Sequence, residues 1–184
     1  REMYYMELSD MLNNLYNFPS IIAWVPFNEG WGQFDSEKVT KYIRDYDSTR
    51  LIDSASGWYD QNAGDFNSIH NYFFKFRTPK LDDRILLLSE FGGYSYLEKE
   101  HSKAEKVYGY RKFKDRLSLA EAIQKLYEKQ IIPNIPRGLS GCIYTQVSDV
   151  QDECNGIFTE DRKMIKIDKK KMKKINDRCQ RSLY

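Results

Sequence analysis

Apolar residues recur at helical spacing in four parts of the chain, which predicts four amphipathic helices. The four sets are Leu8, Met11, Leu12 and Leu15; Val39, Tyr42, Ile43 and Tyr46; Ala120, Ile123, Leu126, Tyr127 and Ile131; and Met172, Ile175 and Cys179. Pro19 ends the first pattern, and Asp35 or Ser36 is placed to cap the second. The sequence Ser118–Glu121 forms a capping box for the third helix, and Asp168 caps the fourth.

Continuous apolar runs of strand length lie between these helices. They predict five strands, at 21–27, 50–54, 68–73, 84–89 and 139–147. Strands that alternate with helices form parallel sheets joined by helical crossovers. The pattern therefore predicts an α/β fold.

The connection 94–117 is long for a loop and is rich in tyrosine, lysine and glutamate. Connections of this length are more often functional or mobile than inert. Within it, Val107–Tyr110 is expected to turn a short hairpin. Two roles stay open for the segment: shaping access to a substrate, or packing on other domains.

Composition narrows the class of protein only slightly. The 184 residues suit one domain, 1–184, and the formal net charge of +2 favours no class of partner. No apolar run approaches the ~18 residues of a membrane helix. The three cysteines have neither zinc-site nor disulfide-framework spacing, so no metal or other cofactor is expected. The lysine run at 169–174 is interpreted as the solvated face of the last helix, and no nucleic-acid partner is expected.

Two predicted strands end in glutamate. Glu29 follows the first apolar run beside Asn28, and Glu90 follows the fourth before Gly92-Gly93. In parallel sheets, chemistry collects at the carboxyl ends of strands. Each glutamate alone is more often only a loop residue that bonds a helix N-terminus or an arginine. Two at matched positions favour paired carboxylates, the arrangement that cleaves glycosidic bonds. Flat aromatic faces at Trp31, Trp58 and Tyr72 suit stacking against a sugar ring.

Four segments carry a resemblance to a known family. The stretch Phe18–Gly32 is similar to the acid/base segment of glycoside hydrolase family 2, the β-galactosidase, β-glucuronidase and β-mannosidase group. Leu87–Gly93 is similar to its nucleophile segment, and Gly141–Gln146 and Asn155–Lys163 resemble the end of its catalytic barrel. The resemblance implies a partial (β/α)8 TIM barrel, strands 4 to 8 with their helices, and thus the C-terminal portion of a longer catalytic domain.

The same resemblance implies roles for individual residues. Glu29 would be the general acid/base and Glu90 the nucleophile, with carboxyl groups roughly 5 Å apart as in a retaining mechanism. Asn28 would bind the sugar 2-hydroxyl and Tyr72 would hydrogen-bond the nucleophile. Substrate contacts are also expected from Trp31, Trp58, His70 and Gln146, although His70 as a structural histidine and Trp58 as a packing residue stay open.

Three features depart from the family pattern. Phe18 stands where relatives often have histidine, and only five of the eight βα units are predicted. Asn155 is followed by Gly156-Ile157, whereas the glucuronidase branch has Asn-x-Lys, which favours a neutral sugar. The implied missing barrel strands would leave two open sheet edges, so the isolated chain is expected to self-associate there and to be a weak catalyst or none.

The sequence therefore predicts the catalytic portion of a retaining β-glycosidase that hydrolyses β-galactoside-like substrates. The alternative is a non-catalytic carbohydrate-binding or interaction module on the same barrel. Beyond the carbohydrate, the expected partners are the missing N-terminal domains of a longer chain. A cytoplasmic and a periplasmic location are equally compatible with the sequence.

Overall fold

The computed structural model describes residues 1–182, which divide into two units, residues 1–68 and residues 69 onward. Both contain helices and parallel strands, so the predicted α/β class is confirmed. The strands form three small open sheets among the described residues, and no closed barrel is formed.

The first unit pairs two helices with a very short parallel sheet. Its elements are α1 (Glu2–Leu15), β1 (Ala23–Trp24), α2 (Ser36–Tyr46) and β2 (Leu51–Ile52). The predicted strand 21–27 is reduced to two residues, because Pro26 has no N–H to donate and Ile22 and Val25 are exposed. The apolar core of the unit gathers Leu8, Leu12, Trp24, Phe27, Val39, Ile43 and Ile52.

Asp47 joins β1 to the segment after α2. Its side chain is fully buried and accepts hydrogen bonds from Trp24 Nε1 at 2.8 Å, Arg50 at 2.7 Å and the Thr49 hydroxyl at 2.6 Å. Burial alone would raise the pKa of Asp47, but the hydrogen bonds from Thr49, Arg50 and Trp24 outweigh it and hold that pKa well below its usual range.

We expect Asp47→Asn to destabilise the first unit at pH 7 by about 1.5 to 3 kcal/mol, because charge-assisted hydrogen bonds are lost. A carboxyl with a depressed folded pKa stabilises above its unfolded pKa, and that contribution is lost as pH falls through the folded value. The difference between wild type and variant should therefore shrink below about pH 4. Tryptophan fluorescence in urea measures it, since all three tryptophans lie in residues 1–68.

The matched control is Asp45→Asn, which removes an exposed ion pair with Lys41. It should change stability by less than about 1 kcal/mol. An Asp47→Asn variant whose stability deficit is equal at pH 7 and pH 3 would contradict the assignment.

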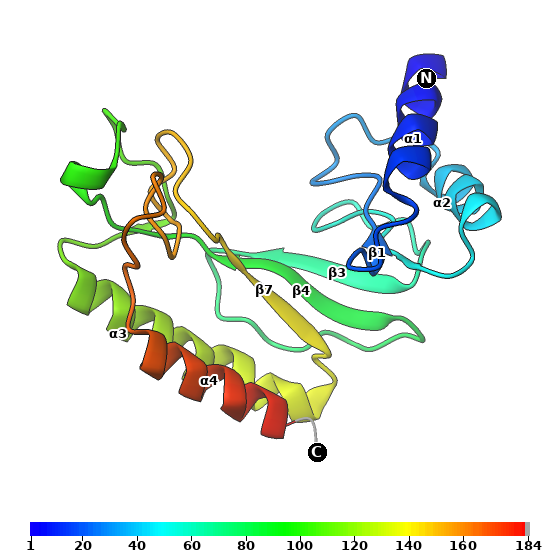
Figure 1. The fold of residues 1–184 in the computed structure, drawn as a ribbon. Coiled ribbons are helices and arrows are strands. Elements are labelled where there is room, and N and C mark those ends of the chain that lie inside the picture. Colours follow the sequence, from blue (N-terminus) through cyan, green and yellow to red (C-terminus); the bar gives the residue numbers. More distant parts are fainter. Residues whose placement is uncertain (183–184) are drawn as a thin grey trace. The chain divides into compact units, whose positions relative to one another are not determined.

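The second unit is built on a three-stranded sheet with the strand order β3-β4-β7. β3 (Phe66–Asn71) crosses the boundary between the units, and β4 (Ile85–Gly92) pairs in parallel with β7 (Gly141–Thr145). Two helices, α3 (Arg116–Leu126) and α4 (Lys169–Arg181), run along one face of this sheet (Figure 1). The core between them contains Leu86, Leu88 and Phe91 of β4, Leu119, Ile123 and Leu126 of α3, and Ile175 of α4.

The helix ends follow local capping chemistry, with one correction. Asp168 caps α4 as predicted and accepts from the Lys170 and Lys171 N–H groups. α3 begins earlier than the predicted capping box, because Asp115 is its N-cap and accepts from the Ser118 N–H at 2.8 Å. The chain continues from α3 through a π-helical turn, η2 (Tyr127–Ile131), and a 3-10 helix, η3 (Ile132–Arg137).

The predicted hairpin at Val107–Tyr110 is wrong. The segment 94–117 instead pairs β5 (Tyr94–Ser95) in parallel with β6 (Arg111–Lys112), and it also contains the short 3-10 turn η1 (Lys99–His101). Gly109, at φ 151°, lies so close to Ser95 that a Cβ there would sit 1.6 Å from the Ser95 hydroxyl oxygen. Packing onto β5, rather than local turn formation, therefore decides the path of this segment.

Candidate functional site

Glu90 reaches the face of the second sheet opposite the helices because β4 is irregular. Leu88 and Phe91 both enter the helix-covered core, and the pairing with β7 shifts register between them. Strict alternation would place Leu88 and Glu90 on the same face. The shift turns Glu90 away from the core, with its side chain 31% exposed. A carboxylate is thus presented at the strand end and stays open to solvent.

Tyr72 holds this carboxylate. Its hydroxyl donates a short hydrogen bond to Glu90 Oε2 and lies 3.0 Å from Thr145 Oγ1 at the end of β7. A phenol has one hydrogen, so Thr145 donates to Tyr72 when Tyr72 donates to Glu90. Burial, and secondly the hydrogen bond to Glu90, raise the pKa of Tyr72, which keeps it a neutral donor. The hydrogen bond expected between Tyr72 and Glu90 is confirmed.

Tyr110 covers Tyr72 from the segment 94–117, whose role the sequence left open. The two rings stack with centroids 3.9 Å apart and planes 10° apart. Gly93, at φ 60°, permits this approach, because a Cβ there would lie 2.4 Å from the Tyr110 ring. Tyr110 and Thr145 are the functional neighbours that sequence reasoning missed: Thr145 adjoins the candidate Gln146 at a strand end, whereas nothing local marks Tyr110.

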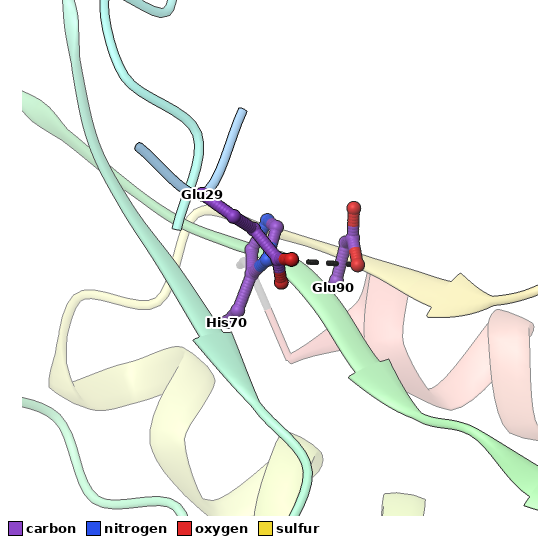
Figure 2. Close-up of side chains that lie close together, drawn as sticks. All are labelled: Glu29, His70 and Glu90. Atoms are coloured by element: carbon purple, nitrogen blue, oxygen red, sulfur yellow. Dashed lines mark ion pairs between the residues drawn. The ribbon is translucent and has the colours of Figure 1, made fainter. Parts of the chain in front are cut away.

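His70 approaches Glu90 from the neighbouring strand. Figure 2 shows the imidazole of β3 directed toward the carboxylate of β4, and Nδ1 lies 3.5 Å from Glu90 Oε2. The His70 side chain is fully buried. The geometry suits a group that orients Glu90 or lines a pocket.

Gln146 follows β7, but its amide is engaged by the loop after the strand. Nε2 donates to Asn155 Oδ1 at 2.7 Å and to Glu153 Oε2 at 3.1 Å. The structure thus places Gln146 beside Thr145 in the chain and holds its side chain by local polar contacts. Its predicted contact with substrate stays a prediction.

The other predicted site residues belong to the first unit. Asn28 and Glu29 follow β1; Asn28 forms a bridge with Ser56, and the Glu29 N–H donates to Ser56 O at 2.9 Å. Glu29 and Gly30 both have positive φ, 54° and 78°, so the chain turns sharply at the candidate acid. Glu29 belongs to the first unit and Glu90 to the second, and the spacing of roughly 5 Å between their carboxyl groups stays a prediction.

The two candidate tryptophans are not core residues. Trp31 is 81% exposed and Trp58 is 45% exposed, whereas Trp24 is buried. Exposed indole faces are suited to stacking on a sugar ring, and Trp58 as a sugar contact or as a packing residue stays open.

The second unit thus brings together His70, Tyr72 and Glu90, and adds Thr145 and Tyr110; the first unit carries Asn28, Glu29, Trp31 and Trp58.

Among residues 1–182, no helix has the length and apolar character needed to cross a bilayer. No protein-family model matches the chain, and no curated protein matches it either.

Proposed function

We propose that this chain supplies the catalytic portion of a retaining β-glycosidase, with Glu90 as the nucleophile. The observation that carries the proposal is the hydrogen bond from Tyr72 to Glu90, at a strand end where the carboxylate remains solvent-accessible. A nucleophilic carboxylate must be ionised, oriented and reachable. A phenol donor that is itself held by Thr145 meets the need for orientation, and the 31% exposure leaves the carboxylate reachable.

Glu29 completes the proposed mechanism as the acid/base. In the first step, a Glu90 oxygen bonds to the anomeric carbon, the glycosidic C–O bond breaks, and Glu29 donates its proton to the leaving oxygen. In the second step, Glu29 takes a proton from water, the water oxygen bonds to the anomeric carbon, and the bond to Glu90 breaks. Two displacements at one carbon leave the β configuration unchanged.

The likeness of the motif segments to glycoside hydrolase family 2 supports the same assignment and the proposed barrel. On that proposal the two units are strands 4 to 8 of a (β/α)8 domain, and the remaining strands belong to sequence outside these 184 residues. A neutral β-galactoside-like sugar would stack on Trp31 or Trp58, with Asn28 at its 2-hydroxyl. The exposure of both indoles supports this part of the proposal.

A fluorosugar tests the nucleophile directly. The full-length protein is incubated with 2-deoxy-2-fluoro-β-galactosyl fluoride, whose fluorine at C2 slows both displacements while the fluoride leaving group keeps the first one fast. We expect time-dependent inactivation and a fluoroglycosyl ester on the peptide that contains Glu90, identified by mass spectrometry.

A label on a different carboxylate would refute the assignment of Glu90. Binding of galactosides with neither turnover nor labelling would favour the non-catalytic carbohydrate-binding alternative. Incubation with excess galactose is the control, because a site-directed label is slowed by a competing sugar.

A further inference from the structure

The second unit has a hollow, lined in part by Tyr72, that the proposed mechanism does not use. It has a volume of about 400 Å³ and is lined by Tyr72, Phe73, Phe74 and Tyr110 on its aromatic side. A second hollow of similar volume, about 400 Å³, shares Lys75, Phe76 and Lys129 with the first. Together we call these two hollows the basic cleft.

The charge of the basic cleft is predominantly positive. Five cationic side chains line it: Lys75, Arg77, Arg111, Lys129 and Arg137. An adjoining hollow that shares Arg111 and Lys129 with the first adds one carboxylate, that of Glu121. Among residues 1–182, none of the five forms an ion pair with an acidic side chain. Like charges lining one cleft repel each other, and a bound anion relieves that repulsion.

The walls of the cleft are fixed by two amide side chains, those of Gln130 and the buried Asn134. Gln130 Oε1 accepts from the Phe76 N–H at 2.8 Å, and Asn134 Oδ1 accepts from the Thr78 N–H at 3.1 Å. Asn134 Nδ2 in turn donates to Gln130 O at 2.7 Å. The loop after β3, which carries Lys75 and Arg77, is thereby held against η2 and η3, so the cations are positioned before any ligand arrives.

Aromatic rings line the same cleft. Phe73 and Phe74 are 72% and 80% exposed, and Phe73 meets Tyr110 edge-on at 4.9 Å. Arg111 lies 5.1 Å from the Phe113 ring centroid, which orients its guanidinium by a cation–π contact. Exposed flat rings beside unpaired cations suit a ligand that has both apolar ring faces and negative charges.

We propose that the basic cleft binds an oligosaccharide that carries carboxylate or sulfate groups. The choice of a glycan rests on the proposed function, because Tyr72 lines the cleft and also bonds the proposed nucleophile. A nucleic acid is less favoured, since the chain has a formal net charge of +2 and a pI near 8.3, below the values typical of nucleic-acid-binding domains. One oligosaccharide would supply both the neutral sugar that is cleaved at Glu90 and the acidic sugars that are held in the cleft.

Calorimetry on the full-length protein tests the inference with four probes: a galacturonate tetrasaccharide, a carrageenan tetrasaccharide, neutral β-1,4-galactotetraose, and a twelve-residue oligothymidylate. The first two separate carboxylate from sulfate recognition. We expect at least one of them to bind about tenfold more tightly than the neutral probe, and to weaken as salt rises. Tighter binding of the oligothymidylate, or equal binding of the neutral probe, would overturn the inference.

Charge-neutralising variants locate the site. Lys129→Gln and Arg111→Gln should each weaken binding of the acidic probe by about two- to fivefold, the scale of a solvent-exposed ion pair. Lys174→Gln on α4 removes the same charge from an exposed position outside the cleft and should leave binding unchanged. Equal losses in Lys174→Gln and Lys129→Gln would refute the cleft as the site.

The Glu90→Gln variant separates this inference from the proposed function. Acidic probes should bind the variant as they bind the wild type. If the wild type binds the acidic probes but has no glycosidase activity, the proposed function is wrong and the cleft assignment stands. If the wild type hydrolyses galactosides but shows no preference for the acidic probes, the cleft assignment is wrong and the proposed function stands.

Discussion

Replacing Glu90 by glycine is expected to lower kcat/KM for nitrophenyl β-galactoside by about 10³-fold or more, because the covalent step loses its nucleophile. The measurement uses the full-length protein, since the predicted barrel strands outside these 184 residues would complete the sugar site. Glu121→Gln, which neutralises an exposed carboxylate on α3, is the matched control and should retain activity within about twofold.

Added azide distinguishes a lost nucleophile from a damaged fold. In Glu90→Gly, azide can occupy the space of the carboxylate, form a bond to the anomeric carbon and displace nitrophenolate. A single displacement inverts that carbon, so the product should be the α-glycosyl azide. A β-glycosyl azide, or full activity of Glu90→Gly without azide, would contradict the role of Glu90.

Replacing Lys166 by methionine is expected to destabilise the second unit by about 3 to 5 kcal/mol, the cost of leaving a buried charge without its partner. Lys166 and Asp149 are both fully buried and are 2.7 Å apart. Lys166 Nζ also donates to the carbonyls of Tyr96 at 2.9 Å and Cys154 at 2.8 Å. One ammonium therefore joins the segment after β5 to the loop after β7.

We expect the ion pair between Lys166 and Asp149 to position the two segments that it joins more than it adds to the free energy of unfolding. Burial lowers the pKa of Lys166 and raises that of Asp149, against the hydrogen bond between them. Asp149 Oδ2 has no hydrogen-bond partner among the described residues, which adds to the cost of burying the charge. The double variant Lys166→Met, Asp149→Leu should consequently recover part of the stability lost in the single variant, but not all of it, because the buried Gly156 N–H loses its bond to Asp149 Oδ1.

Urea unfolding followed by far-ultraviolet circular dichroism measures these differences. The control, Lys173→Met, breaks an exposed ion pair with Asp177 on α4 and should change the free energy of unfolding by less than about 1 kcal/mol. A Lys166→Met variant with the same free energy of unfolding as this control would show that the buried ion pair does not stabilise the packing of these segments.

Local sequence determined the elements whose signal lies within a few residues. The run that ends at Glu90 predicted β4, and Asp168 predicted the start of α4, because strand burial and helix capping depend on neighbours in the chain. Strand ends also carry polar side chains in parallel sheets, which is why Glu29 and Glu90 could be singled out. The partial barrel that the resemblance implies stays a proposal, since the described sheets are small and open.

Tertiary contacts determined which side chains surround Glu90, Tyr72 and Lys166. The register shift after Leu88 sets the face on which Glu90 emerges, and the stacking of Tyr110 on Tyr72 joins segments 38 residues apart in the chain. Lys166 was one lysine among many in the sequence, yet it is fully buried because Asp149 and two carbonyls converge on it. Such groups meet only when distant segments pack, and the free energy of burying them depends on partners that no local pattern specifies.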